Sequence, residues 1–181
     1  MSYTGPSLVE QCYDEIIDFV TGANLTAKLA DYASRSTDGL PLSKPAVVLL
    51  GDYDLKDIRP DQFPVVIVKP GTVTVNPEGE IRPLGENLYV FEISFWLGIR
   101  GENIQNMQLQ LFRYDNAFQD IVDDPRTVPT QKTLTNSIRQ VVAFAYHTTL
   151  RMETYMAAAT FIDIKIKTQF PRGINAPYTG G

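Results

Sequence analysis

The chain has 181 residues, a net charge of -5 and a sequence pI of about 4.9. This length is enough for one domain with a real core, and a 44% hydrophobic content with nine Tyr and nine Phe excludes a chain too polar to fold. The net negative charge argues against a protein that binds nucleic acid tightly, because phosphate binding requires clustered Lys and Arg. A channel through which DNA slides is still compatible with this charge. We expect one domain over residues 1–170 and a flexible tail over residues 171–181.

The N-terminal region indicates two helices. Ser7 is a suitable cap for the first, whose apolar stripe contains Leu8, Cys12, Ile16, Phe19 and Val20. The second carries Leu25, Leu29 and Tyr32 and ends in the polar run Ser34 to Gly39. Because Cys12 is the only cysteine, it cannot form an internal disulfide, and it favours a reduced cytosolic setting and a buried position. We expect neither a signal peptide nor a membrane span, since no apolar run approaches the roughly 20 residues that spanning requires.

Three short strands are predicted next, with a projecting loop after them. The strands are expected over Ala46–Leu50, Val65–Val68 and Thr72–Val75, and nearby prolines, Pro70 among them, mark element ends or sheet edges. The turn-rich stretch Asn76 to Glu86 follows, and we expect it to project from the sheet.

The region from Asn87 to Asp124 determines the fold. An alternating strand places one set of side chains on a core face and another on a mixed face: Tyr89, Phe91, Ile93, Phe95, Leu97 and Ile99 against Glu92, Ser94, Trp96 and Arg100. An amphipathic helix follows directly, with a stripe of Ile104, Met107, Leu111, Tyr114, Phe118, Ile121 and Val122. Neither element carries a catalytic group.

Two consecutive antiparallel strands are expected near the C-terminus. In the first, Ile138, Val142, Phe144, Tyr146 and Leu150 are in phase; in the second, Ile162, Ile164 and Ile166 oppose Asp163, Lys165 and Lys167. The small residues from Met156 to Thr160 permit a bulge or close packing. The whole order predicts an α+β fold, a mainly antiparallel sheet with helices packed on one side and long projecting strands or loops. We interpret strands that overhang the body as elements of assembly.

The sequence offers little to enzyme chemistry. His147 is the only histidine and lies in a predicted strand, so a structural or surface role is favoured over catalysis. Asp52, Asp54 and Asp57 form the densest carboxylate cluster, which caps and turns explain better than a hard cation does. A glycine-rich phosphate loop is missing, and one Cys with one His cannot make a zinc site. We expect no enzyme activity, no cofactor and no metal.

Three aromatic side chains stand on the mixed face of the sheet. Trp96 is on the less apolar face of its strand, and Tyr155 and Phe161 share a face with Asp163 and Lys165. They are either a second packing layer or anchors in a subunit interface.

The order and pattern from Leu8 to Phe170 resemble the tail terminator and head-to-tail joining proteins of tailed bacteriophages. The resemblance rests on an N-terminal helix, the strand PVVIVK, the strand VFEISFWLGIRG with its internal Trp, an immediate amphipathic helix, and two closing strands ending in FIDIKIK. None of these is a catalytic signature.

The resemblance implies a structural virion protein that assembles in the host cytoplasm and forms a ring, a homohexamer, that terminates the tail tube. Its implied partners are the tail-tube protein and the neck or connector proteins, and DNA passes through the lumen without specific binding. A ring uses two different patches per subunit. We expect contacts in the loops Asn76 to Glu86 and Asp123 to Thr133 and at the aromatic residues; the candidates are Trp96, Tyr155, Phe161, Pro77, Glu78, Arg82, Pro125 and Arg126. The alternatives are a head-completion or tail-tube protein and a small ligand-binding domain or enzyme.

Overall fold

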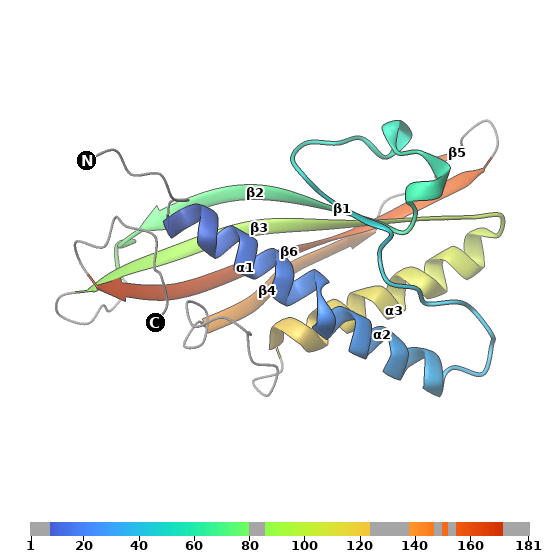
Figure 1. The fold of residues 1–181 in the computed structure, drawn as a ribbon, viewed down its shortest axis with the longest axis horizontal. Coiled ribbons are helices and arrows are strands. Elements are labelled where there is room, and N and C mark those ends of the chain that lie inside the picture. Colours follow the sequence, from blue (N-terminus) through green and yellow to red (C-terminus); the bar gives the residue numbers. More distant parts are fainter. Residues whose placement is uncertain (1–7, 80–85, 124–137, 147–149, 152–154, 172–181) are drawn as a thin grey trace.

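The computed structural model describes residues 8–79, 86–123, 138–146, 150–151 and 155–171. Three α-helices, α1 (Leu8–Thr21), α2 (Ala23–Arg35) and α3 (Ile104–Asp123), cover one side of a six-stranded sheet (Figure 1). The strands are β1 (Val47–Leu50), β2 (Val65–Val75), β3 (Glu86–Gly101), β4 (Ile138–Tyr146), β5 (Leu150–Arg151) and β6 (Met156–Pro171). Two short 3-10 turns, η1 (Leu55–Asp57) and η2 (Pro60–Gln62), lie between β1 and β2.

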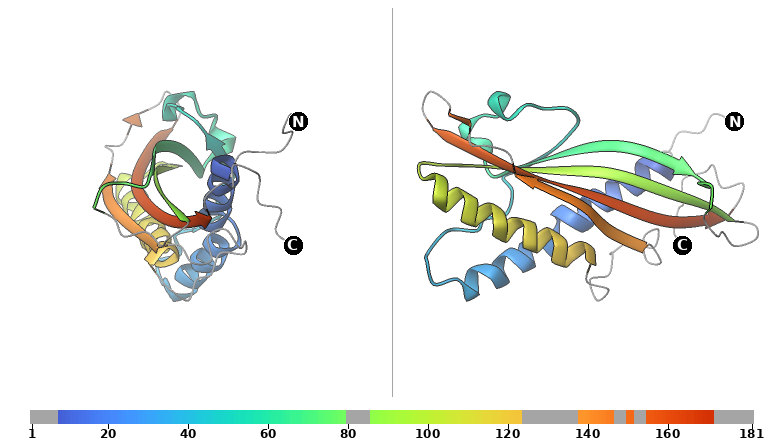
Figure 2. Two further views of the ribbon diagram at one scale, coloured as in Figure 1. Left: turned by 90° about the vertical axis from the view of Figure 1, so that its left-hand side faces the viewer. Right: turned by 180° about the vertical axis from the view of Figure 1, so that it is seen from behind.

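The sheet has the order β1-β2-β3-β6-β4, with β5 paired to β6. Only β1 and β2 run parallel, and every other pairing is antiparallel. Seen along the strands, the sheet is curved, with the helices on one side and the segment that carries η1 and η2 on the other (Figure 2). The predicted fold class, an α+β sheet that is mainly antiparallel and has its helices on one side, is confirmed.

The strands β3 and β6 form the longest ribbon of the molecule. Each has 16 residues, and they pair without interruption from Glu86 opposite Pro171 to Gly101 opposite Met156. This is about three times the usual strand length of five or six residues. At one end of the sheet, β2, β3 and β6 extend past the helices (Figure 1).

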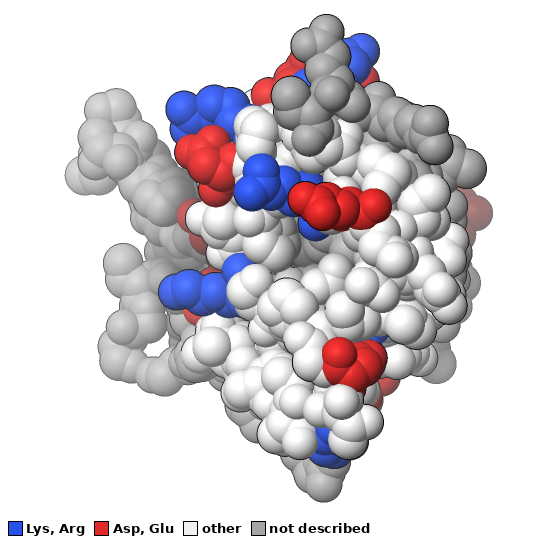
Figure 3. Space-filling model, turned by 90° about the vertical axis from the view of Figure 1, so that its right-hand side faces the viewer, with Lys and Arg blue, Asp and Glu red and all other residues white. Residues whose placement is uncertain are grey.

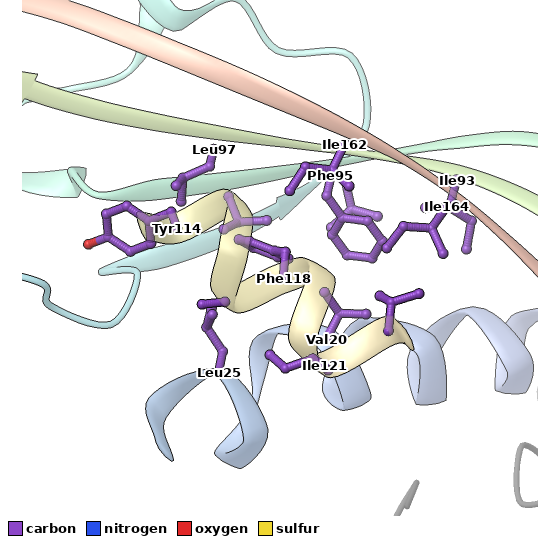
Figure 4. Packing of buried hydrophobic residues seen from close by; sticks show 14 of the residues in the cluster. Val20, Leu25, Ile93, Phe95, Leu97, Tyr114, Phe118, Ile121, Ile162 and Ile164 are labelled. Atoms are coloured by element: carbon purple, nitrogen blue, oxygen red, sulfur yellow. The ribbon is translucent and has the colours of Figure 1, made fainter. Parts of the chain in front are cut away.

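The main core lies between the sheet and the helices. Alternation puts Phe91, Phe95 and Leu97 of β3 on the helix side, where all three are fully buried. They pack against the stripe of α3 and against α1 and α2, and Phe95 and Phe118 have ring centroids 6.2 Å apart (Figure 4). The predicted buried stripes of the three helices are confirmed for the described side chains, with two exceptions. Tyr32 of α2 is half-buried, and Ile104, the first residue of α3, is 42% exposed.

Glycine 22 separates α1 from α2. Its amide donates to the carbonyl of Asp18 at 2.8 Å, and a Cβ here would lie only 2.5 Å from that same carbonyl oxygen. Only glycine allows so close a turn between two consecutive helices. The prediction of two helices in the N-terminal region is therefore confirmed.

The strand β2 differs from the prediction of two separate strands. Val65–Val68 and Thr72–Val75 belong to one strand, whose pairing with β3 shifts register between Pro70 and Val73. Because β1 pairs only with Val65–Val68, the rest of β2 is an edge of the sheet, where a proline costs no ladder hydrogen bond. The expectation that Pro70 marks a sheet edge is correct.

The phase of two C-terminal segments also differs from the prediction. The stretch Met156 to Thr160 holds unbroken register with β3, so it has no bulge in that pairing, while its alanines are buried as close packing requires. The shift lies instead in β4, between Val141 and Ala143. As a result Ile138 pairs with Lys167 and Phe144 with Ile162, so the expected single phase along β4 is wrong.

Candidate interaction surfaces

A second, smaller core covers part of the helix-free face of the sheet. Leu55 and Ile58, from the segment between β1 and β2, are buried against Val65, Ile67 and Ala159. Gly98 makes room for them, because a Cβ there would lie 2.5 Å from Leu55 Cδ2 and 2.9 Å from Val65 Cγ1. This face is therefore a packing layer at one end of the sheet.

Trp96 lies at the border of this small core. It pairs with Phe161 across the β3–β6 ladder, and the two rings stack with centroids 5.4 Å apart and an interplanar angle of 22°. The Lys69 ammonium lies 4.0 Å from the centroid of the Trp96 ring, and its Nζ is 2.5 Å from an Asp52 carboxylate oxygen. Trp96 is half-buried and packs against the second core. Within the described chain, the reading of Trp96 and Phe161 as a packing layer is the one the contacts support.

Tyr155 fixes the start of β6 to the same layer. Its hydroxyl donates to the Ile58 carbonyl at 3.2 Å, and its ring meets Phe63 edge-on at 5.9 Å between centroids. All three aromatic candidates therefore have partners inside the chain, and their expected role as subunit contacts stays a prediction.

Polar side chains cover the same face further along the strands. Ser94 donates to Asp163, and Lys165 Nζ lies 3.1 Å from Glu92 Oε1. Together with Gly71 and Thr72 they line a hollow of about 330 Å³. The charges of Lys165 and Glu92 are paired across the β3–β6 ladder, whereas Asp163 accepts a hydrogen bond from the neutral hydroxyl of Ser94.

The aspartate cluster after β1 has structural roles. Asp54 caps η1 by accepting from the Lys56 amide at 3.1 Å, and Asp52 pairs with Lys69. Within the described ranges, no group of three or more His, Cys, Asp or Glu residues is placed to hold a metal ion. No helix in this part of the chain is long and apolar enough to cross a membrane.

The predicted contact loops are described only in part. Asn76 joins the end of β2 to the start of β3, since its amide donates to the Leu88 carbonyl at 2.7 Å and its side chain accepts from the Leu88 amide at 2.9 Å. Pro77 and Glu78 follow it at the projecting end of the ribbon, with Glu78 exposed. The remaining loop candidates, Arg82, Pro125 and Arg126, lie outside the described residues, as do His147 and the tail over residues 172–181.

Sequence reasoning missed the attachment of the segment 36–45 to α3. Tyr114 donates to the Ser43 carbonyl at 2.6 Å, Gln110 donates to the Pro41 carbonyl at 2.7 Å, and Arg113 forms an ion pair with Asp38. Burial raises the pKa of Tyr114 to about 12, and the Arg113 guanidinium holds the pKa of Asp38 well below its usual range. The spacing of Gln110, Arg113 and Tyr114 places them on one side of the helix, but no pattern names their partner.

A buried polar pair between α3 and β6 was also missed. Asp115 is 3% exposed and accepts a hydrogen bond from the hydroxyl of Thr160 at 3.2 Å. Asp115 does not belong to the apolar stripe predicted for α3, so only the structure shows that its side chain is buried.

Comparison with known proteins identifies no family for this chain. No protein-family model matches the chain, and no curated protein matches it significantly.

Proposed function

We propose that the chain is a structural virion protein of a tailed bacteriophage, a ring subunit that terminates the tail tube and joins it to the neck and head. The observation that carries the proposal is the β3–β6 ribbon, 16 residues on each strand, which continues past the helices. A single domain of this size needs strands of about five or six residues to bury its core. Strand length beyond the helical layer offers strand edges and faces for contact with another subunit, and that is useful to an assembly subunit.

Two further properties support the proposal. Two ion pairs, Lys69 with Asp52 and Lys165 with Glu92, hold lysines against carboxylates, which suits contact better than catalysis. The net charge of -5 favours a surface past which DNA moves without being held.

The first test is the mass of the purified chain in solution, by native mass spectrometry and analytical ultracentrifugation. A ring predicts an oligomer, six subunits if the symmetry is that of the resembling family, or a monomer that assembles when tail tubes are added. A chain that stays monomeric with tubes present and binds a small molecule would contradict the proposal and favour a ligand-binding domain.

The second test separates this role from that of another neck or tail component. Electron microscopy of particles made without the protein should show overlong or unjoined tails beside full heads. Tails of normal length beside leaking heads would instead indicate a head-completion protein, and the absence of tails altogether would indicate the tube protein.

A further inference from the structure

The solvent side of α3 has an unusual composition. Its exposed residues from Ile104 to Gln119 within an arc of about 140°, at about 100° per residue, form what we call the α3 outer face. All of them are uncharged: Ile104, Gln105, Gln108, Leu109, Phe112, Asn116 and Gln119. The exposed Asp123 follows on the same side in the last turn of the helix. Three are large and apolar, with exposed fractions of 42% for Ile104, 40% for Leu109 and 45% for Phe112. The end of the molecule at which α3 begins also shows a broad uncharged surface between separate charged groups (Figure 3).

A second apolar surface, the β1 patch, lies at the edge of the sheet. It consists of Val48, Leu50 and Tyr53, which are 39%, 54% and 43% exposed. These two surfaces together hold six of the seven large hydrophobic side chains that are exposed in the described region. Scattered apolar side chains are normal on a protein surface, whereas a gathering of this kind marks a contact.

The edge at β1 is only four residues long, but it lacks the charged side chains, proline and bulge that protect other edge strands. The free half of β2 has Lys69, Pro70 and a register shift, all of which discourage pairing with another chain. The four residues of β1 are all Val or Leu, and in the described sheet β1 has a neighbour on one side only. The free edge of β2 is therefore better protected than the edge at β1. This difference indicates that contact with another chain at β1 is not being avoided.

We propose that the α3 outer face of one copy of this chain packs against the β1 patch of a second copy. Charge selects the second copy as the occupant. Two copies of a chain with a net charge of -5 repel each other, so they can approach closely only through surfaces without uncompensated negative charge. The α3 outer face meets this condition. So does the β1 patch, because the neighbouring carboxylates Asp52 and Asp54 are in ion pairs with Lys69 and Lys56.

The contact rests on the proposed ring and assigns surfaces to it. A ring needs two different patches on each subunit, one for each neighbour, and here one patch is on a helix and the other on a sheet edge. Apolar side chains at the centre with amide groups around them match the composition of interface cores, in which charged residues are depleted. The exposed amides of Gln105 and Gln108 can then hydrogen-bond across the contact.

The test introduces a charge into each patch of the full chain and measures the assembled fraction by native mass spectrometry and sedimentation velocity, with tail tubes present and absent. Leu109→Asp and Leu50→Lys should each weaken association at least about tenfold, since each places an unpaired charge in an apolar contact. Ala30→Asp is the control, because Ala30 is exposed on α2 and lies neither in the two patches nor at the projecting end of the sheet. It should assemble like the wild type, and circular dichroism should show all variants folded.

Combining the two substitutions tests the direction of the contact. In the double variant Leu50→Lys with Leu109→Asp, each new carboxylate faces a new ammonium on the next copy, so assembly should return toward the wild-type level. A contact between two α3 outer faces would not be restored by this pair, and that result would overturn the proposal. A wild type that assembles while both single variants assemble equally well would overturn the contact but leave the ring standing. A wild type that stays monomeric even with tubes would overturn both.

Discussion

The helices α1 and α3 lie on the same side of the sheet and bury similar stripes, yet their solvent faces are opposites. The outer side of α1 carries Glu10, Asp14 and Asp18, which repeat every four residues, and this helix has no Lys or Arg. The outer side of α3 has no charged residue from Ile104 to Gln119. In both helices the apolar stripe follows from the need to cover the sheet.

The difference shows that the buried face and the solvent face of a helix are under different constraints. Buried stripes are alike because one sheet covers them both. Like charges four residues apart destabilise a helix slightly, and nothing in the fold requires them on α1. An acidic face of this kind therefore favours contact with water. An uncharged face of four turns is hydrated less favourably than a charged one, so it suits packing against protein.

The largest expected effect comes from the buried side of α3. Phe118 is fully buried against Phe95, so Phe118→Ala should lower the free energy of unfolding by about 3–5 kcal/mol. Phe112→Ala removes the same side chain from the α3 outer face and should cost less than about 1 kcal/mol in the isolated subunit. Urea denaturation followed by circular dichroism measures both. Equal losses would mean that the two faces of α3 are not distinct in the way proposed.

A smaller effect is expected where α3 holds the segment 36–45. Tyr114→Phe removes the hydrogen bond to the Ser43 carbonyl and should cost about 1 kcal/mol of unfolding free energy. Tyr53→Phe is the control, because the ring of Tyr53 is 43% exposed on the β1 patch, and its loss of a hydroxyl should change stability by less than about 0.5 kcal/mol. The same denaturation series compares them. If the two variants lose equal stability, the Ser43 bond contributes nothing of its own.

Much of the fold was predictable because periodicity directly reports burial. The alternation of β3 and the spacing of α3 each persist over 16 or more residues, so a local irregularity cannot hide the pattern. Where the prediction was wrong, in β4 and β2, a register shift changed the phase within one strand. A shift depends on the partner strand, which the local sequence does not contain.

The surfaces were less predictable than the fold. Trp96 meets Phe161, 65 residues later in the chain, because a continuous register of β3 with β6 places them opposite each other. Its other neighbours include Lys69 of β2 and the small core that Leu55 completes, and the space for Leu55 depends on Gly98. The α3 outer face, by contrast, could have been found by reading its polar side for charge as well as for polarity.

A substitution on the acidic side of α1 should change the free energy of unfolding less than Phe118→Ala or Tyr114→Phe does. Asp14→Lys replaces two repulsive pairs, with Glu10 and Asp18, by two attractive ones, and should raise the free energy of unfolding by about 0.5–1 kcal/mol at low salt. Gln108→Lys on α3 is the control, since the residues four positions away are Ile104 and Phe112. It should change stability by less than about 0.5 kcal/mol. The gain on α1 should shrink in about 1 M salt, and a gain that salt leaves unchanged would exclude charge as its cause.

The smallest effect is a change in titration rather than in overall stability. The pKa of Asp38 is held below its ordinary range first by the hydrogen bond from Arg113 and then by the bond from Ser36, which is 2.6 Å long. Because the folded pKa is lowered, the interaction contributes fully above the unfolded pKa, near 3.9, and is lost as the pH falls through the folded value. Arg113→Gln should therefore raise the pKa of Asp38 toward that of an ordinary carboxyl, as measured by NMR titration. Ser36→Ala should raise it less. A larger rise in the Ser36 variant would mean that Arg113 is not the main cause of the lowered pKa of Asp38.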